Sequence, residues 1–235
     1  MSAHQLASVA AAFLLASVPA TSALAIGVHG QGTWETSLLP RDLNGDGVAD
    51  AYFDAAQSIT WLADANFSLT SGQSATGQMD WFAAMSWAAG LQVGTTSGWR
   101  LPVTFDMQGH NNPHLPPPGS SELAYMYYVT LGNIGSPNLG NGLSNTGPFA
   151  NIQEYPYWSS PEIPGANGAF ALWMGMPGNA GGQQGYSFGN LLNAWAVHDG
   201  DVGASLPVPE PGSLLMLSAG LIFLAAKRKY EATSR

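Results

Sequence analysis

Apolar positions form two uninterrupted runs near the ends of the chain and shorter patterned segments between them. The first run, residues 6–18, has the length of the hydrophobic region of a signal peptide, and Ala23-Leu24-Ala25 supplies a small-x-small cleavage pattern. The segment before the run carries His4 but no Lys or Arg, which departs from the usual basic start. We expect residues 1–25 to be a signal peptide, with Ala23 and Ala25 as the small residues that signal peptidase reads.

The second run, residues 213–226, follows Pro211-Gly212 and ends at the basic cluster Lys227, Arg228 and Lys229. Such a run is short for a membrane-spanning helix, which needs about 20 residues, so length alone favours a buried helix. The abrupt basic cluster instead indicates a stop-transfer signal with its positive residues inside. Because long basic side chains reach the interface and offset part of the mismatch, we expect a transmembrane helix over 213–226 in the inner membrane.

Between these ends, the periodicity predicts short strands and two helices. One helix is expected over 78–91, with Trp81, Met85 and Ala88 on its apolar face, and the other over 120–131, capped by Ser120 or Ser121. Strands are expected as a hairpin over 51–62 and at 155–160, 169–174 and 194–198. Strands before and after two helices predict an α+β fold with an antiparallel sheet. We expect the first and last strands to lie side by side, since domain ends are often close.

Composition narrows the kind of domain. The 235 residues are 46% hydrophobic and include 8 Trp, 8 Tyr and 9 Phe, which is enough apolar material for a core. Only 9% are charged, against roughly 25% in typical soluble domains. Together with 29 Gly and 16 Pro, this predicts long Gly/Asn/Pro loops. The chain has no Cys, which excludes disulfides and thiolate metal sites.

Charge is distributed unevenly. Between residues 26 and 209 the only basic residues are Arg41 and Arg100, against thirteen acidic residues, which gives that span a formal charge of −11. Such a surface repels phosphate backbones, so nucleic acid is excluded as a partner. It also disfavours sulfated glycans and attracts cations.

A short acidic segment carries the sharpest candidate chemistry. From Asp42 to Asp50, oxygen-bearing residues stand at positions 1, 3, 5 and 9 with Gly47 at position 6, as at the start of a Ca²⁺-binding loop. Position 12 is Phe53 instead of Glu, so the acid one residue later is the candidate substitute. The candidate ligands are Asp42, Asn44, Asp46, Val48 (through its carbonyl), Asp50 and Asp54. We expect weak Ca²⁺ binding that fastens the N-terminal edge of the domain; the alternative is an acidic turn without metal.

The C-terminal segment resembles a known sorting signal. Val208-Pro209-Glu210-Pro211 precedes the apolar run and the basic cluster, and these three parts in this order are similar to the PEP-CTERM signal of Gram-negative bacteria. The resemblance implies that residues 207–235 are recognised by exosortase, a membrane transpeptidase-like enzyme that removes the tail. It also implies a protein bound for the cell surface or the extracellular matrix.

Several phrases of the middle resemble the DUF1566 family, also called the Lcl C-terminal domain. In order along the chain they are Ile59-Thr-Trp-Leu-Ala-Asp-Ala-Asn66, Gly98-Trp-Arg-Leu-Pro102, Ser121-Glu-Leu with Tyr127-Tyr, Leu131-Gly-Asn133, Tyr157-Trp-Ser-Ser-Pro-Glu162 and Ala194-Trp-Ala-Val-His-Asp-Gly200. The resemblance implies a C-type lectin-like domain over 26–206, with a core at about 50–202. The family's best-known members bind polyanionic glycans, but here His198 replaces a common Arg and the surface is acidic.

Aromatic residues supply candidates for a sugar-binding surface, because a flat ring can stack on the C–H face of a sugar. The candidates are Tyr157, Trp173, Tyr186 and Trp195, and the alternative is that these rings form the core. Amides on the same loops, such as Gln183 and Gln184, can bond sugar hydroxyls. Arg100 is expected to pair with an acid such as Asp199 or Glu162 and so hold the sheet.

An enzymatic function is not expected. Ser159, His198 and Asp199 contain the residue types of a hydrolase triad, but no G-x-S-x-G elbow accompanies them. The sequence therefore predicts an exported, non-enzymatic protein that binds an exopolysaccharide. A structural matrix component without a small ligand is the alternative, and a hydrolase is the third.

Overall fold

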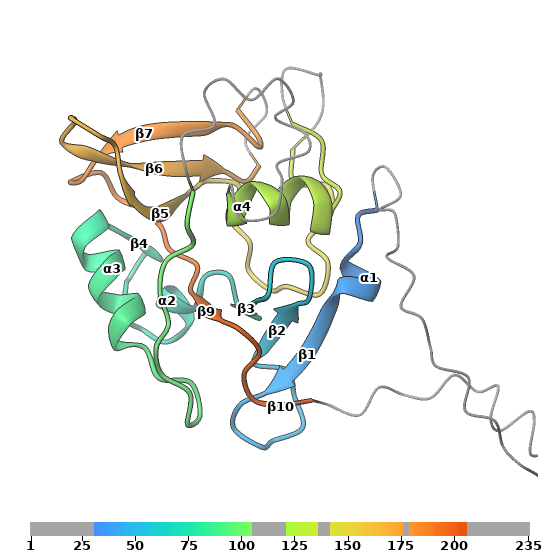
Figure 1. The fold of residues 1–235 in the computed structure, drawn as a ribbon. Helices are drawn as coiled ribbons and strands as arrows, with labels where there is room; N and C mark the ends of the chain where they lie inside the picture. Colours follow the sequence, from blue (N-terminus) through green and yellow to red (C-terminus); the bar gives the residue numbers. More distant parts are fainter. Residues whose placement is uncertain (1–30, 105–120, 136–141, 176–178, 206–235) are drawn as a thin grey trace, which may run out of the picture.

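The computed structural model describes residues 31–104, 121–135, 142–175 and 179–205. These residues form two mainly antiparallel sheets with short helices around them, which is an α+β arrangement in which strands predominate (Figure 1). The α+β class is thus as predicted. The signal peptide and the membrane segment that the sequence predicts lie outside the described residues.

The first sheet has the strand order β10-β1-β2-β3-β9. Its strands are β1 (Leu38–Asp42), β2 (Ala51–Asp54), β3 (Ile59–Leu62), β9 (Val197–Asp199) and β10 (Ala204–Ser205). The hairpin predicted over 51–62 is confirmed as β2 and β3, which pair antiparallel. The first and last described strands, β1 and β10, lie side by side, with Arg41 opposite Ser205. The strand that the sequence predicted as the last, 194–198, is a strand only at 197–198, within β9, and it pairs with β3 and not with the first strand.

The second sheet has the order β4-β8-β5-β6-β7. Its strands are β4 (Gln78–Met79), β8 (Leu192–Asn193), β5 (Pro156–Glu162), β6 (Gly168–Trp173) and β7 (Gln183–Ser187). The predicted strands at 155–160 and 169–174 are confirmed as β5 and β6. Strand β7 was missed because its sequence is polar and Gly-containing. It forms nonetheless, because an edge strand needs only one hydrogen-bonded neighbour and can leave its other edge in water.

The described residues also form five short helical segments. They are α1 (Trp34–Ser37), α2 (Phe67–Thr70), α3 (Trp81–Gly90), α4 (Glu122–Tyr125) and a π-helix over Met126–Thr130. Asp80 caps the start of helix α3, and its side chain accepts a hydrogen bond from the amide of Ala83 at 2.8 Å. Its fully buried residues are Trp81, Ala84 and Ala88, and Met85 is half-buried and packs against the same core, so the predicted apolar face is confirmed with Ala84 added. The second predicted helix does begin after a Ser121 cap, but it changes to π geometry after Tyr125.

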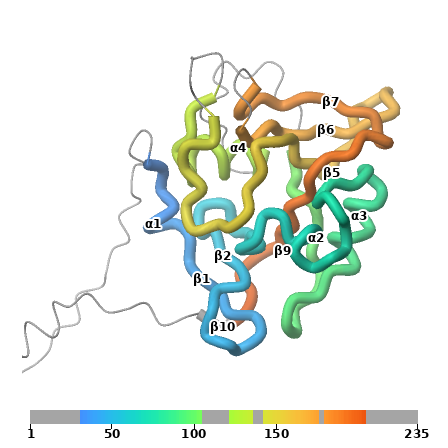
Figure 2. The backbone as a smooth tube through the Cα atoms, turned by 180° about the vertical axis from the view of Figure 1, so that it is seen from behind, coloured from blue at the N-terminus to red at the C-terminus, as the bar shows by residue number. Residues whose placement is uncertain are grey.

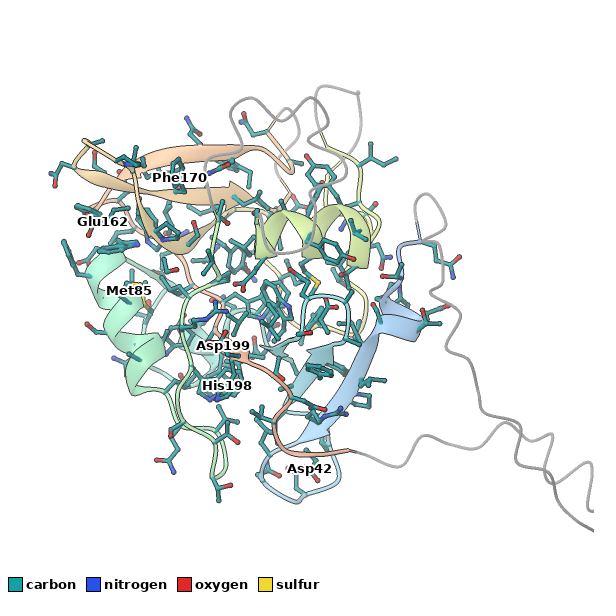
Figure 3. All side chains as sticks on the ribbon, viewed as in Figure 1. Asp42, Met85, Glu162, Phe170, His198 and Asp199 are labelled. Atoms are coloured by element: carbon teal, nitrogen blue, oxygen red, sulfur yellow. The ribbon has the colours of Figure 1, made fainter. Side chains whose placement is uncertain are left out.

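Aromatic side chains fill the space between the sheets. Four Trp side chains that are at most 2% exposed form its centre: Trp61, Trp99, Trp158 and Trp195. The rings of Trp61 and Trp195 lie 4.7 Å apart, and Phe149 packs edge-on against Trp195. Figure 3 shows side chains crowding this region between the sheets. Large aromatic rings therefore fill much of the core volume that branched aliphatic side chains fill in most proteins.

An extended segment joins the two sheets. Arg100 exchanges two backbone hydrogen bonds with Val197 of the first sheet, and the carbonyl of Pro102 accepts one from Ser160 of β5. Seen from behind, β1, β2 and β10 lie at one end of the molecule and β6 and β7 at the other, with β9 between them (Figure 2). Within the four described ranges, no helix has both the length and the apolar character needed to cross a bilayer.

Candidate functional site

The acidic segment forms a compact loop between β1 and β2. Its centre is Asp42, whose carboxylate accepts hydrogen bonds from the amides of Asn44, Gly45 and Gly47 at 3.2, 2.6 and 2.9 Å. These bonds, with that from Gly47 foremost, hold the pKa of Asp42 below its usual value. Gly45 and Gly47 have φ of +82° and +86°, a conformation that other residues adopt only with strain.

The side chains of the loop bind mainly to the loop itself. The amide nitrogen of Asn44 donates to Asp46 at 3.1 Å and to Asp50 at 3.2 Å, and Asp50 also accepts the amide of Leu43 at 2.8 Å. The structure therefore brings together four of the predicted Ca²⁺ ligands: Asp42, Asn44, Asp46 and Asp50. The donor types suit Ca²⁺. Across the described ranges, however, no three His, Cys, Asp or Glu side chains are grouped so as to hold a metal ion.

Asp54 does not belong with these ligands. It pairs with Leu38 at the far end of β2 from the loop. Its side chain is fully buried and accepts hydrogen bonds from Thr130 at 3.0 Å and from the side chain of Gln57 at 3.1 Å. Its burial raises the pKa of this carboxyl, although the hydrogen bonds oppose the shift. The alternation of side chains along β2 could not predict the burial of Asp54, because its hydrogen-bond partner Thr130, on the π-helix, is 76 residues away in the sequence.

Two of the four proposed sugar-stacking rings are inaccessible. Tyr157 and Trp195 are 0% exposed, and Trp195 donates its indole N–H to the carbonyl of Leu62 at 2.8 Å. A ring that is covered on both faces cannot stack on a ligand, so their assignment to a sugar site was wrong. The alternative that rings form the core applies to both of them.

The other two rings lie together on β6 and β7. Trp173 and Tyr186 are both half-buried, and each donates a hydrogen bond to the side-chain oxygen of Gln184, at 3.1 and 2.9 Å. Tyr155 packs against Trp173 with 5.6 Å between ring centres. We call Tyr155, Trp173, Gln184 and Tyr186 the aromatic strip. Of these residues, Tyr155 was not a sequence-based candidate, although its position immediately before the aromatic strand β5 is a usable signal.

Arg100 is the centre of a charged cluster. It donates to both carboxylate oxygens of Glu122 at 2.8 Å and also to Asp199, so the pairing with Asp199 is confirmed and Glu162 is not its partner. Proximity to Arg100 holds the pKa of Asp199 below its usual value. Glu122 also accepts the amide of Val103 at 2.7 Å. The cluster thus fastens helix α4 to β9.

The hydrolase-type residues are not assembled into a triad. Ser159 is buried in the second sheet and donates its hydroxyl to the carbonyl of Phe170 at 2.7 Å. His198 lies in the first sheet, where its ring packs against Trp99 and its Nδ1 lies 2.6 Å from the backbone oxygen of Asp199. A nucleophile and its base need a hydrogen bond between them, and these two side chains have other partners.

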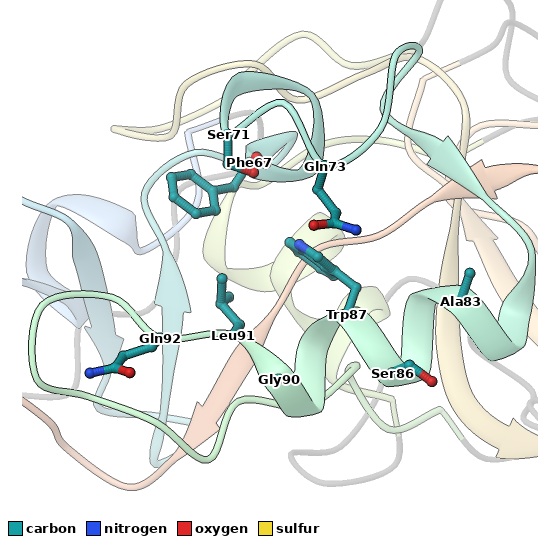
Figure 4. Close-up of a pocket in the computed structure, with 9 residues that line it drawn as sticks. All are labelled: Phe67, Ser71, Gln73, Ala83, Ser86, Trp87, Gly90, Leu91 and Gln92. Carbon is teal, nitrogen blue, oxygen red and sulfur yellow. Dashed lines mark hydrogen bonds between the residues drawn. The ribbon is translucent and has the colours of Figure 1, made fainter.

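Sequence analysis missed a cleft between α2 and α3 (Figure 4). Its volume is about 630 Å³, and it is lined by residues that include Phe67, Gln73, Ser86, Trp87 and Gln92. The available signal was Trp87, a large aromatic residue that falls outside the buried face of helix α3.

Comparison with known proteins finds a match only for the C-terminal end of the chain. Neither the curated proteins nor the solved structures contain a significant match. Residues 207–229 match the PEP-CTERM protein-sorting motif, a range that includes Val208, Pro209, Glu210, Pro211 and the basic residues Lys227, Arg228 and Lys229. The chain therefore carries the signal of an exported, exosortase-sorted protein of Gram-negative cells.

Proposed function

We propose that this exported protein is a non-enzymatic cell-surface or matrix protein that binds carbohydrate through the aromatic strip. The observation that carries the proposal is the convergence of Trp173 and Tyr186 on one amide, Gln184, with all three side chains accessible to solvent. Two half-exposed rings offer flat apolar faces to the C–H surfaces of sugars. The amide nitrogen of Gln184 can donate to a hydroxyl, since the two rings use only its oxygen.

The negative charge of the domain favours some classes of carbohydrate over others. The span between residues 26 and 209 has a formal charge of −11, which repels sulfated and other polyanionic chains. None of the four residues of the strip is charged. A neutral exopolysaccharide is therefore the ligand class that meets the least electrostatic opposition.

The resemblance to the DUF1566 family supports the same proposal. Its phrases include Trp61, Trp99, Trp158 and Trp195, and all four of these rings are at most 2% exposed. Asn133, another residue of these phrases, accepts three hydrogen bonds from Ser144 and Asn145 and donates one to the carbonyl of Asn145. Packing of the core and fixing of a loop are roles expected of residues that define the fold of a family. A C-type lectin-like domain would be compatible with an α+β fold that has long loops.

We also propose that the loop from Asp42 to Asp50 binds Ca²⁺ weakly. The support is the set of oxygen donors on four neighbouring side chains. The ion would draw these oxygens inward and fasten β1 to β2. Its place is structural, because the loop lies at the opposite end of the molecule from the aromatic strip (Figure 1).

Binding to the polysaccharide of the producing bacterium tests the proposal. The full-length chain, kept in a detergent without a sugar headgroup, is passed over immobilised neutral and sulfated polysaccharides. We expect retention on a neutral one, and at least tenfold weaker binding for Trp173→Ala and Gln184→Ala, a loss of about 1.4 kcal/mol. Leu191→Ala is the matched control, since Leu191 is an exposed apolar residue outside the strip. Absence of binding to every glycan would overturn the proposal in favour of a purely structural matrix role.

A further inference from the structure

The cleft between α2 and α3 is built from neutral groups. One wall comes from helix α2 and the turn after it, with Phe67, Ser71 and Gln73, and the other from helix α3 and its end. Nine residues line it, all from the described part of the chain, and none of them is charged. An uncharged concave surface offers no counter-charge to a cation or an anion and suits a neutral ligand.

Trp87 supplies a flat apolar surface in this cleft. It is half-buried, with part of its ring packed against the core and the rest facing the cleft. Figure 4 shows the side chains of Trp87 and Gln73 directed toward one another across the opening, with Phe67 and Leu91 beside them. An indole combines a large apolar face with one N–H donor, so it can both stack on a ligand and bond it.

Several polar groups of the cleft are not used by the protein. The indole N–H of Trp87, the amide of Gln73 and the hydroxyl of Ser86 make no hydrogen bond with the described residues. Gln92 has one long bond, 3.3 Å to the carbonyl of Gly94. Free donors and acceptors around an aromatic face are the groups that a polyhydroxylated ligand needs.

The size of the cleft fits a small ligand or a chain segment. Its volume of about 630 Å³ lies within the range of roughly 300–1,000 Å³ that is typical of small-molecule sites. The space beside Gly90 is open, because a Cβ added there would meet no atom within 4 Å.

We infer that the cleft between α2 and α3 is a second carbohydrate site, which binds a short segment of a neutral oligosaccharide with Trp87 as the stacking surface and Gln73 as the hydroxyl partner. The inference takes its ligand class from the proposed function but uses different residues and different elements. Two separate sites on one domain would let it bind two stretches of one polysaccharide, or two polysaccharide chains at once.

NMR of the full-length chain in a detergent without a sugar headgroup tests the inference. The probes are cellotetraose, maltotetraose and mannotetraose, with a galacturonate tetramer as the charged comparison. We expect one neutral probe to shift the indole N–H signal of Trp87, which is identified by its loss in Trp87→Phe. The buried indole signal of Trp61 should stay in place, and the galacturonate tetramer should shift neither.

Variants separate this site from the aromatic strip. Gln73→Ala and Trp87→Ala should weaken binding at the cleft about tenfold, or 1.4 kcal/mol, and Gln73→Ala tests the site even if loss of the ring impairs folding. Phe82→Ala is the matched control, since Phe82 is an exposed ring on the same helix that packs against Trp81 and Phe188 instead of facing the cleft. Retained shifts in Trp173→Ala with none in Gln73→Ala support the second site. Binding that depends on Trp173 and is indifferent to Gln73 and Trp87 overturns the inference and leaves the proposed function standing.

Discussion

Arg41 and Asp201 form a bidentate ion pair, with Nε and one terminal nitrogen of Arg41 donating to the two carboxylate oxygens at 2.6 and 2.8 Å, across a sequence separation of 160 residues. The side chain of Arg41 is only 5% exposed, and its guanidinium lies over the ring of Phe53. The pair fastens β1 to the segment that ends in β10, immediately before the sorting motif. It therefore holds the C-terminal edge of the folded domain next to its processing signal.

Arg41→Ala should destabilise the domain. Asp201 is half exposed and can be rehydrated, so we expect a loss of about 2 kcal/mol in the free energy of unfolding, the usual size for hydrogen bonds to charged groups. Urea denaturation measures it, and hydrogen exchange should show faster exchange for the amides of β10. Arg41→Lys keeps the charge without the planar fork, so its free energy of unfolding should lie between those of the wild type and Arg41→Ala. An unchanged midpoint in Arg41→Ala would show that the pair adds nothing to stability.

The buried tryptophans should respond differently to replacement by Phe. Trp158 and Trp195 donate their indole N–H groups to the carbonyls of Met79 and Leu62 at 2.9 and 2.8 Å, whereas the buried N–H of Trp61 has no partner. Each replacement removes similar volume, but only the first two orphan a buried acceptor. We expect Trp158→Phe and Trp195→Phe to cost about 1–3 kcal/mol more than Trp61→Phe. Equal losses in thermal denaturation of the three variants would contradict this.

Asp54 and Asp201 should impose opposite pH dependences. Burial raises the pKa of Asp54 in the folded state, so its contribution is fully present below its ordinary pKa of 3.8 and is lost as the pH rises through the raised value. The stability of the wild type relative to Asp54→Asn should therefore fall as the pH rises above 3.8.

The Asp201 carboxyl titrates in the other direction. Arg41 lowers the pKa of this group, so its contribution is present above 3.8 and is lost as the pH falls through the lowered value. The wild type should lose stability relative to Asp201→Asn as the pH falls below 3.8. Urea unfolding at each pH measures both differences, and slopes of the same sign would refute the assignment.

Calcium should stabilise the protein through the loop that follows β1. With a dissociation constant of about 10⁻⁴–10⁻³ M, 10 mM Ca²⁺ would add about 1.4–2.7 kcal/mol to the free energy of unfolding. The readout is the unfolding temperature with Ca²⁺, with Mg²⁺ at equal ionic strength and with EDTA. Asp46→Asn should abolish the gain, because it removes one carboxylate from the proposed ligands. It should disturb the loop itself little, since Asp46 accepts only one backbone hydrogen bond, from Val48.

A charge-matched control separates this effect from general screening. Glu162→Gln removes one negative charge from an exposed position on the other sheet and should keep the full response to Ca²⁺. A gain that persists in Asp46→Asn, or one that Mg²⁺ reproduces, would exclude a specific site at this loop.

The sequence by itself determined the features that depend on local order along the chain. The sorting motif is such a feature, since its tripeptide, apolar run and basic cluster are read in linear order. Helix α3, the hairpin of β2 and β3 and the strands β5 and β6 were likewise predictable, because periodicity and turn residues act over a few positions.

Tertiary structure alone decided which of the chemically suitable side chains are available to a ligand. Tyr157 and Trp173 both stand in strands that the sequence predicts, yet packing buries the first completely and leaves the second half-buried beside Gln184. Asp54 is separated from the acids of the loop because it stands at the far end of β2, where it is buried and accepts a hydrogen bond from Thr130, far along the chain. Burial is set by contacts between distant segments, so local pattern supplies the chemical groups and only the packed fold selects those that face water.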